Sequence, residues 1–232
     1  MLYFAFGIFD VLSLWIGGEW EVAHYVTKCL LMPCLILFIW IQRAQVRNHR
    51  LMLLALCLSF VGDVCLLNQG FLPMVSGIAA FLLAHICYIT WFLGGMGISL
   101  KEVLRNQFPA IILIIVIESV ILMTLWPGLG SMRIPVTIYA LVITVMTLAA
   151  FSRKGHVSML SFLLVSGGSA MFMLSDTLYA TVNFGADIVT IPRGEMWIML
   201  TYIIAQGLIA LGSTQENLVG SARIHQSSDL LQ

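Results

Sequence analysis

Residues 51–68 read LMLLALCLSFVGDVCLLN, and this stretch decides the class of fold. It is long and apolar enough to cross a bilayer, since a spanning helix needs about 20 such residues. Its one charged residue is Asp63, and a second acid, Asp176, lies in the apolar segment 158–183. Hydrocarbon surroundings disfavour the ionised form of a carboxyl group, so acids in these positions predict a functional site.

The composition of the whole chain leads to the same class. Of its 232 residues, 60% are hydrophobic and 9% are charged, and the mean hydropathy is +1.01. Soluble globular proteins do not have such values, so we expect an all-α, polytopic membrane protein with about eight helices. The formal net charge of zero excludes a basic face for nucleic acid. The expected spans are 2–17, 23–41, 51–68, 72–93, 107–126, 133–151, 158–183 and 196–213.

The expected spans leave no room for a soluble domain, so we expect a single transmembrane domain over residues 1–213. The segment 214–232 lacks hydrophobic periodicity and is expected to be a mobile cytoplasmic tail. The first span is short, which predicts a tilted or partly interfacial helix. No Lys or Arg precedes Lys28, so this span does not read as a signal peptide. The five cysteines show no metal-type CxxC pairing.

The distribution of Lys and Arg predicts the orientation. Cytoplasmic loops of membrane proteins carry an excess of these residues, and here eight of the 11 fall on one side. We therefore expect both termini in the cytoplasm, and the short loops favour a bacterial inner membrane. Oligomeric state does not follow from the sequence. The eight are Arg43, Arg47, Arg50, Lys101, Arg105, Arg153, Lys154 and Arg223, and the other three are Lys28, Arg133 and Arg193.

Polar residues of the expected helices fall at one depth. A rise of 1.5 Å per residue places them between the bilayer midplane and the non-cytoplasmic end. Polar residues from seven helices at one level predict the lining of one cavity. Tyr88 shares a helix face with His85. The residues of this layer are Lys28, Asp63, His85, Glu118, Tyr139, Asp176, Tyr202 and Gln206.

Small residues accompany both acids. Gly62 precedes Asp63, and the run SGGS at 166–169 precedes Asp176 by one to three turns. Small residues allow helices to approach closely, so the acids are expected to face protein. The segments 59–71 and 172–184 also resemble each other weakly. A parallel repeat of four helices would explain that likeness.

Five segments together resemble those of the lysoplasmalogenase family, in order and spacing, over nearly the whole chain. They are GDVCL at 62–66, AHICY at 84–88, IPVTIY at 134–139, LSD at 174–176 and TYIIAQ at 201–206. The resemblance implies an integral membrane hydrolase that cleaves the vinyl-ether bond of lysoplasmalogens. The products would be a fatty aldehyde and glycerophosphoethanolamine or glycerophosphocholine. The resemblance implies no metal or organic cofactor. It also implies that the protein's partners are the lysophospholipid substrate and membrane lipids.

The chemistry of that reaction suits the two acids. Vinyl-ether hydrolysis begins with delivery of a proton to the β-carbon, and a carboxylic acid in an apolar pocket can supply it. A second carboxylate stabilises the resulting cation and activates water. We expect Asp63 to donate the proton and Asp176 to act as the base, with His85 positioning water or tuning the pair.

The remaining polar residues are expected to bind substrate. Tyr139, Tyr202 and Gln206 would hold the ether oxygen or the glycerol hydroxyl, and Lys28 would bind the phosphate as a point charge. Tyr88 and Glu118 complete the expected substrate-binding set.

Structural roles compete with these functional ones. An Asp63–Lys28 salt bridge would fasten two helices, and His85 would be an ordinary core histidine. Tyr88, Tyr139 and Tyr202 would be packing aromatics, and Gln206 would link helices through a hydrogen bond. Asp10, in the short first span, is expected to pair locally or to face water.

Three other functions stay open. A zinc-dependent membrane hydrolase of the alkaline ceramidase type needs about three histidines around its metal, and only His85 falls well inside a span. A proton-coupled transporter would use Asp63, His85 and Asp176 as a relay. A lipid-binding or lipid-sensing protein would bind the same ligand without turnover.

Overall fold

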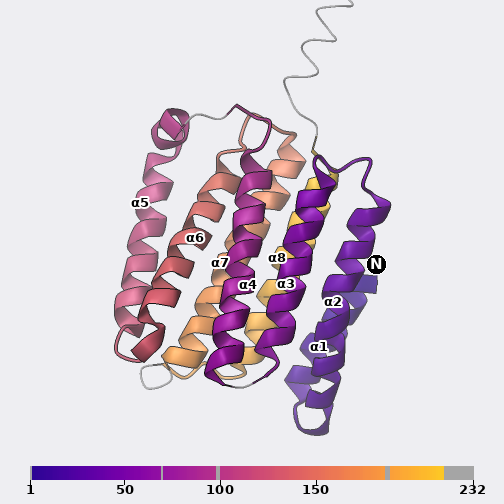
Figure 1. Cartoon of the computed structure of the whole chain (residues 1–232), viewed down its shortest axis with the longest axis vertical. Coiled ribbons are helices and arrows are strands. Elements are labelled where there is room, and N and C mark those ends of the chain that lie inside the picture. The colour runs from indigo at the N-terminus through magenta and orange to yellow at the C-terminus, as the bar shows by residue number, and fades with distance from the viewer. Residues whose placement is uncertain (1, 69, 98–99, 186–188, 217–232) are drawn as a thin grey trace, which may run out of the picture.

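The computed structural model describes residues 2–68, 70–97, 100–185 and 189–216. Within these ranges the protein consists of eight α-helices and two short 3₁₀ turns, without strands (Figure 1). The predicted all-α class and number of helices are thereby confirmed. The elements are α1 Leu2–Ile16, η1 Gly18–Trp20, α2 Glu21–Ile41, α3 His49–Leu66, α4 Phe71–Leu93, α5 Leu100–Leu125, η2 Gly130–Met132, α6 Arg133–Phe151, α7 Met159–Phe184 and α8 Gly194–Thr214.

Seven helices, α2 to α8, are long and apolar enough to cross a bilayer. The protein is therefore an integral, multi-pass membrane protein. Helix α1 has only 15 residues, which give a length of about 22 Å against a hydrocarbon core of about 30 Å. It lies beside α2 at one edge of the bundle, and its N-terminus is at mid-height (Figure 1).

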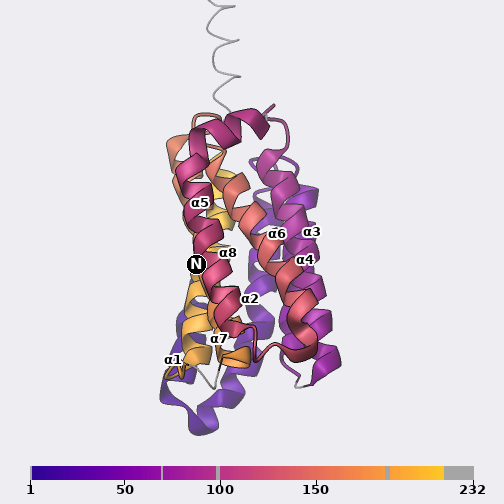
Figure 2. The same ribbon diagram turned by 90° about the vertical axis from the view of Figure 1, so that its left-hand side faces the viewer.

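The helices surround α8, which is the most buried of the spanning helices. In its most apolar 18-residue window, 72% of the residues are buried, against 6% for α5. Helix α8 packs mainly on α7 and also contacts α1 and α2, while α3 pairs with α4. Within the described residues, helix α5 contacts α6 and α7 but none of the other helices, and it forms the opposite edge of the bundle (Figures 1 and 2).

Glycines allow two of these helix pairs to approach closely. A Cβ atom on Gly62 would lie 2.6 Å from the Phe81 ring, and one on Gly168 would lie 2.9 Å from the Ala205 carbonyl oxygen. One on Gly167 would meet only Leu208, at 3.8 Å. The expected small-residue contacts therefore form at Gly62, between α3 and α4, and at Gly168, between α7 and α8. The proposed parallel repeat stays a prediction.

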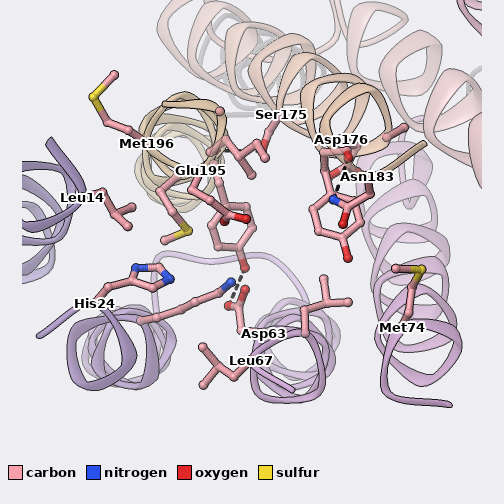
Figure 3. Close-up of a pocket in the computed structure, with 18 of the residues that line it drawn as sticks. Leu14, His24, Asp63, Leu67, Met74, Ser175, Asp176, Asn183, Glu195 and Met196 are labelled. Carbon is pink, nitrogen blue, oxygen red and sulfur yellow. Dashed lines mark hydrogen bonds between the residues drawn. The ribbon is translucent and has the colours of Figure 1, made fainter. Parts of the chain in front are cut away.

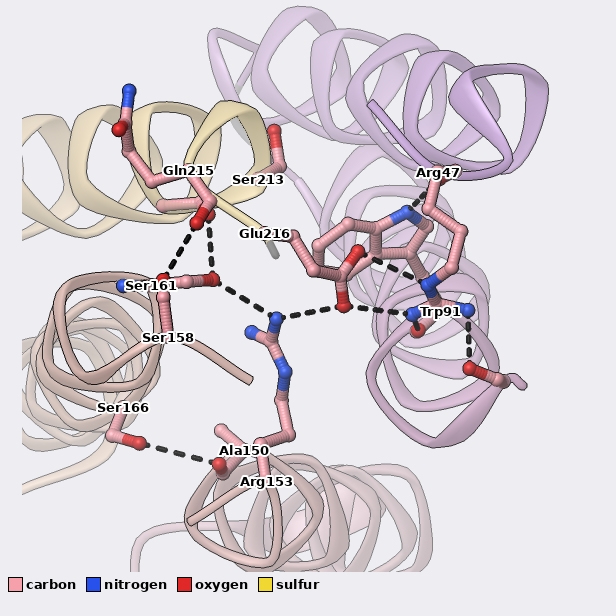
Figure 4. A network of polar contacts seen from close by, with 12 residues as sticks. Arg47, Trp91, Ala150, Arg153, Ser158, Ser161, Ser166, Ser213, Gln215 and Glu216 are labelled. Carbon is pink, nitrogen blue, oxygen red and sulfur yellow. Dashed lines mark hydrogen bonds and ion pairs between the residues drawn. The ribbon is translucent and has the colours of Figure 1, made fainter. Parts of the chain in front are cut away.

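An ionic network closes the end of the bundle where α2, α4, α6 and α8 finish (Figure 4). The Glu216 carboxylate forms ion pairs of 3.0 Å with Arg47 and with Arg153. Burial lowers the pKa of the Arg153 guanidinium group to about 10, and Glu216 opposes that shift. Arg153 is therefore charged at neutral pH while fully buried.

The network bears on the segment that was expected to be mobile from residue 214. Helix α8 continues to Thr214, and the side chain of Glu216 is almost completely buried. Residues 217–232 lie outside the described residues.

Candidate active site

A cavity of about 800 Å³ opens at the other end of the bundle, where α3 and α7 end and α2, α4, α6 and α8 begin (Figure 3). Asp63 on α3 and Asp176 on α7 face it from different walls. Lys28, Tyr139 and Tyr202 also line it. The structure therefore brings both acids into one cavity, as the layer of polar residues led us to expect.

The Asp63 carboxyl group is held by a chain of side chains from α8. The hydroxyl group of Tyr202 donates a hydrogen bond of 2.8 Å to Oδ2 of Asp63. Gln206, one turn further along α8, donates through Nε2 to the Tyr202 oxygen at 3.4 Å and to Ser59 at 3.1 Å. Its Oε1 accepts from the Tyr88 hydroxyl group at 2.7 Å. Tyr88 and Gln206 are fully buried and act behind the cavity wall.

Asp176 has a different pair of partners. The Tyr139 hydroxyl group donates to Oδ2 of Asp176 at 2.6 Å. Nε2 of His85 lies 2.8 Å from the Tyr139 oxygen and 3.4 Å from the same carboxylate oxygen. Because the tyrosine has one hydrogen to give, Nε2 of His85 is the donor. His85 is fully buried behind the lining, and its Nδ1 has no hydrogen-bond partner among the described residues.

One phenylalanine ring links the two groups. The Phe172 ring centroid lies 4.7 Å from that of His85 and 5.4 Å from that of Tyr202, with edge-to-face geometry in both contacts. Phe172 is fully buried. Such packing fixes the rotamers of both neighbours, and through them the positions of the carboxyl groups.

Lys28 lines the cavity from α2. Among the described residues its ammonium group forms no ion pair within 4.0 Å, so the Lys28–Asp63 salt bridge considered above is not formed at that distance. Glu118 does not line the cavity. It lies half-buried on the peripheral α5, where its Oε1 has no hydrogen-bond partner within the described chain.

A polar cluster beside the cavity was not predicted from the sequence. Asp10 is fully buried, and its Oδ1 lies 3.0 Å from Nδ1 of His24 and accepts a hydrogen bond from the Thr27 hydroxyl group. Asp10 thus neither faces water nor pairs within its own helix. The one signal was the spacing of His24, Thr27 and Lys28, which share a face of α2.

The cavity combines two carboxyl groups with an apolar wall. Each carboxyl group accepts a hydrogen bond from a tyrosine, an arrangement suited to acid–base chemistry on an amphiphilic molecule. Within the described residues, no group of three His, Cys, Asp or Glu side chains is placed to hold a metal ion. The apolar wall includes Leu14, Leu66, Met74, Ile78, Phe81, Val136, Met196 and Met199.

Comparison with known protein families identifies one family to which the chain is related. The sequence profile of the YhhN family matches residues 23–213, which include all of the residues expected in the site. The chain belongs to the YhhN family. That match begins after Asp10, so it leaves out the α1 side of the polar cluster. No solved structure gives a significant match.

Several relatives of this YhhN-family chain have names that state an activity. The chain is 30% identical over 208 residues to lysoplasmalogenase TMEM86B of Homo sapiens, covering 86% of this chain and 80% of that protein. It is 28% identical over 217 residues to the protein of that name from Sus scrofa, covering 92% and 82%. It is 29% identical over 171 residues to a lysoplasmalogenase of Mycobacterium tuberculosis, covering 72% and 61%.

Proposed function

We propose that the protein hydrolyses the vinyl-ether bond of lysoplasmalogens. Products would be a fatty aldehyde and glycerophosphoethanolamine or glycerophosphocholine. The observation that carries the proposal is that Asp63 and Asp176 face one cavity, each hydrogen-bonded to a tyrosine. The names of the human, porcine and mycobacterial relatives support the same substrate.

Asp63 is the proton donor in this mechanism. It has less contact with solvent than Asp176, and such surroundings favour the neutral acid that proton donation requires. Its proton moves to the β-carbon of the vinyl ether, and the former double bond becomes an oxocarbenium ion. Asp176 takes a proton from water as the water oxygen bonds to the cationic carbon, which gives a hemiacetal.

Collapse of the hemiacetal returns Asp63 and Asp176 to their starting protonation states. The hemiacetal hydroxyl proton moves to Asp63, and the proton on Asp176 moves to the departing glycerol oxygen. The carbon–oxygen bond to glycerol breaks, and the aldehyde is released. His85 and Tyr139 orient Asp176 throughout, while Tyr202, Gln206 and Tyr88 hold Asp63.

The lysolipid fits the two kinds of surface in the cavity. Lys28 binds the phosphate, and the apolar wall binds the start of the hydrocarbon chain. Tyr139 and Tyr202 are placed to contact the ether oxygen or the glycerol hydroxyl group. The volume of about 800 Å³ lies within the range of small-molecule sites. Glu118 has no contact with substrate in this arrangement.

We propose further that residues 1–213 form one transmembrane domain with both termini in the cytoplasm of a bacterial cell. The charge bias supports the orientation, because five described basic residues lie at the network end and three at the cavity end. Lys101 and Arg105 add to the network end by their positions in the sequence. Reporter fusions at the C-terminus test this. The described basic residues are Arg43, Arg47, Arg50, Arg153 and Lys154 at the network end, and Lys28, Arg133 and Arg193 at the cavity end.

Purified protein with a lysoplasmalogen, followed by mass spectrometry, tests the reaction. We expect stoichiometric release of aldehyde and the glycerophospho-alcohol, with one oxygen from labelled water in the aldehyde before exchange. Vectorial movement of intact lipid across vesicles would instead favour a transporter, and saturable binding without products would favour a sensor. Loss of activity on exhaustive chelation would favour the zinc hydrolase.

A further inference from the structure

The buried pair of Asp10 and His24 lies outside the proposed acid–base machinery. Asp10 is 0% exposed, and the side chain of His24 is 10% exposed. The ring contacts Asp10 through Nδ1, at 3.0 Å. His24 also lines the cavity, and Figure 3 shows its ring directed into that space. Because Nδ1 is occupied by Asp10, Nε2 is the nitrogen available to a ligand.

The burial of Asp10 limits which side chains can balance a charge on its carboxyl group. A carboxylate removed from water needs a compensating positive charge or it is strongly disfavoured. Of the two side chains bonded to Asp10, His24 and Thr27, only the imidazole can carry that charge. An anion at Nε2 would therefore bind the protonated ring, which then donates through Nδ1–H to Asp10 and through Nε2–H to the anion.

Lys28 follows His24 by one helical turn on the same face of α2, and both residues line the cavity. Nε2 of His24 has no hydrogen-bond partner within the described chain. Lys28 has no carboxylate within 4.0 Å there. The protonated His24 ring and the Lys28 ammonium group, one turn apart, would form a binding site for an anion with several oxygen atoms.

We propose that His24 and Lys28 together bind the phosphodiester of the lysolipid, and that Asp10 is a positioning residue that orients the His24 ring toward it. The inference rests on the proposed function for the identity of the lipid. Asp63 faces the same cavity, so the site holds the phosphate at one wall while the vinyl ether reaches the acids. Through Asp10, this site also gives α1 a role in substrate binding, although α1 lies outside the region matched by the family profile.

Binding of a lipid that cannot be hydrolysed tests the site apart from catalysis. The probes are a 1-alkyl-glycerophosphoethanolamine and the matching 1-alkylglycerol, which lacks the phosphate. We expect His24→Ala to weaken binding of the phospholipid about 10- to 100-fold and to leave the alkylglycerol unchanged, since the lost contact is a charge-assisted hydrogen bond. His49→Ala, at the opposite end of the bundle, is the matched control and should change neither affinity.

A double-mutant cycle tests the role of Asp10. Asp10→Asn should weaken phospholipid binding when His24 is present and have no further effect in the His24→Ala background, because Asp10 acts through that ring. His24→Lys should restore part of the affinity by restoring the charge. Equal losses for both probes, or additive effects of the two substitutions, would overturn the proposal. Tight phospholipid binding by a wild-type protein that releases no aldehyde would reject the proposed reaction while leaving this site supported.

Discussion

The hydroxyl group of Tyr139 lies 2.6 Å from Oδ2 of Asp176 and donates a hydrogen bond to it. Helices α6 and α7, which carry these residues, are connected by a short loop at the opposite end of the bundle. The contact fixes a carboxylate that otherwise reaches into the open cavity, where its side chain is partly exposed. A base held in this way is pre-oriented for the reacting water.

Removal of that hydroxyl group should lower activity more than stability. We expect Tyr139→Phe to reduce kcat/KM for aldehyde release about tenfold or more, because Asp176 loses its orienting donor. Tyr3→Phe is the matched control, since Tyr3 also donates one buried hydrogen bond, of 2.8 Å to Ile203, but does not line the cavity. Steady-state kinetics and melting temperatures of both variants distinguish the effects. Equal losses of activity would contradict the role of Tyr139.

The side chains of Tyr88 and Gln206, which share a hydrogen bond, should contribute to the free energy of unfolding as a coupled pair. Gln206→Met leaves the buried Tyr88 hydroxyl group without its acceptor, at a cost of about 1–3 kcal/mol in the free energy of unfolding. Adding Tyr88→Phe removes that hydroxyl group and should recover part of the loss. Denaturation of the two single variants and the double variant measures the coupling. A double variant with strictly additive losses would show that the contact does not form.

Gly168 and Gly167 provide a matched pair for the packing of α7 against α8. Gly168→Ala places a methyl group against the backbone of α8, so we expect a loss of about 1–3 kcal/mol in stability. Gly167→Ala meets ordinary contact distances and should be neutral. Thermal unfolding in one detergent compares them directly. Equal stability of the two variants would contradict the close approach.

The ionic network predicts where the C-terminal segment can be cut. Deletion of residues 217–232 keeps the Glu216 carboxylate, whereas deletion of residues 216–232 leaves Arg153 buried without it, so we expect the longer deletion to be the less stable of the two. Breaking a buried pair costs about 3–5 kcal/mol. Melting temperatures of the two truncated proteins test this, and Glu216→Gln should resemble the longer deletion. Similar melting temperatures would show that Glu216 does not contribute to stability.

The helices were predictable because hydropathy alone identifies the segments that can cross a membrane. The expected span 133–151 matches α6, and 72–93 matches α4 within one residue. Helix α5 begins at Leu100 and not at 107, because a helix can continue into polar sequence that hydropathy assigns to a loop. The convergence of Asp63 and Asp176 was predictable for a related reason, since residues at one depth in a helical bundle share a layer.

Pairings between distant residues were not predictable. Asp10 appeared to be an isolated acid in a short helix, and its burial depends on how α1 docks on α2. Glu216 meets Arg47 across 169 positions of sequence, so no local pattern reveals the contact. Depth also gave no information on which helices line the cavity, and Glu118 lies on the peripheral α5, outside the lining.

Aldehyde release by isosteric variants of the two acids tests the central claim most directly. Asn cannot supply or accept the proton, so we expect Asp63→Asn and Asp176→Asn each to lower kcat on a lysoplasmalogen at least about 100-fold, with melting temperatures that still show folded protein. Rates near that of the wild type in either variant would contradict the shared role of these carboxyl groups.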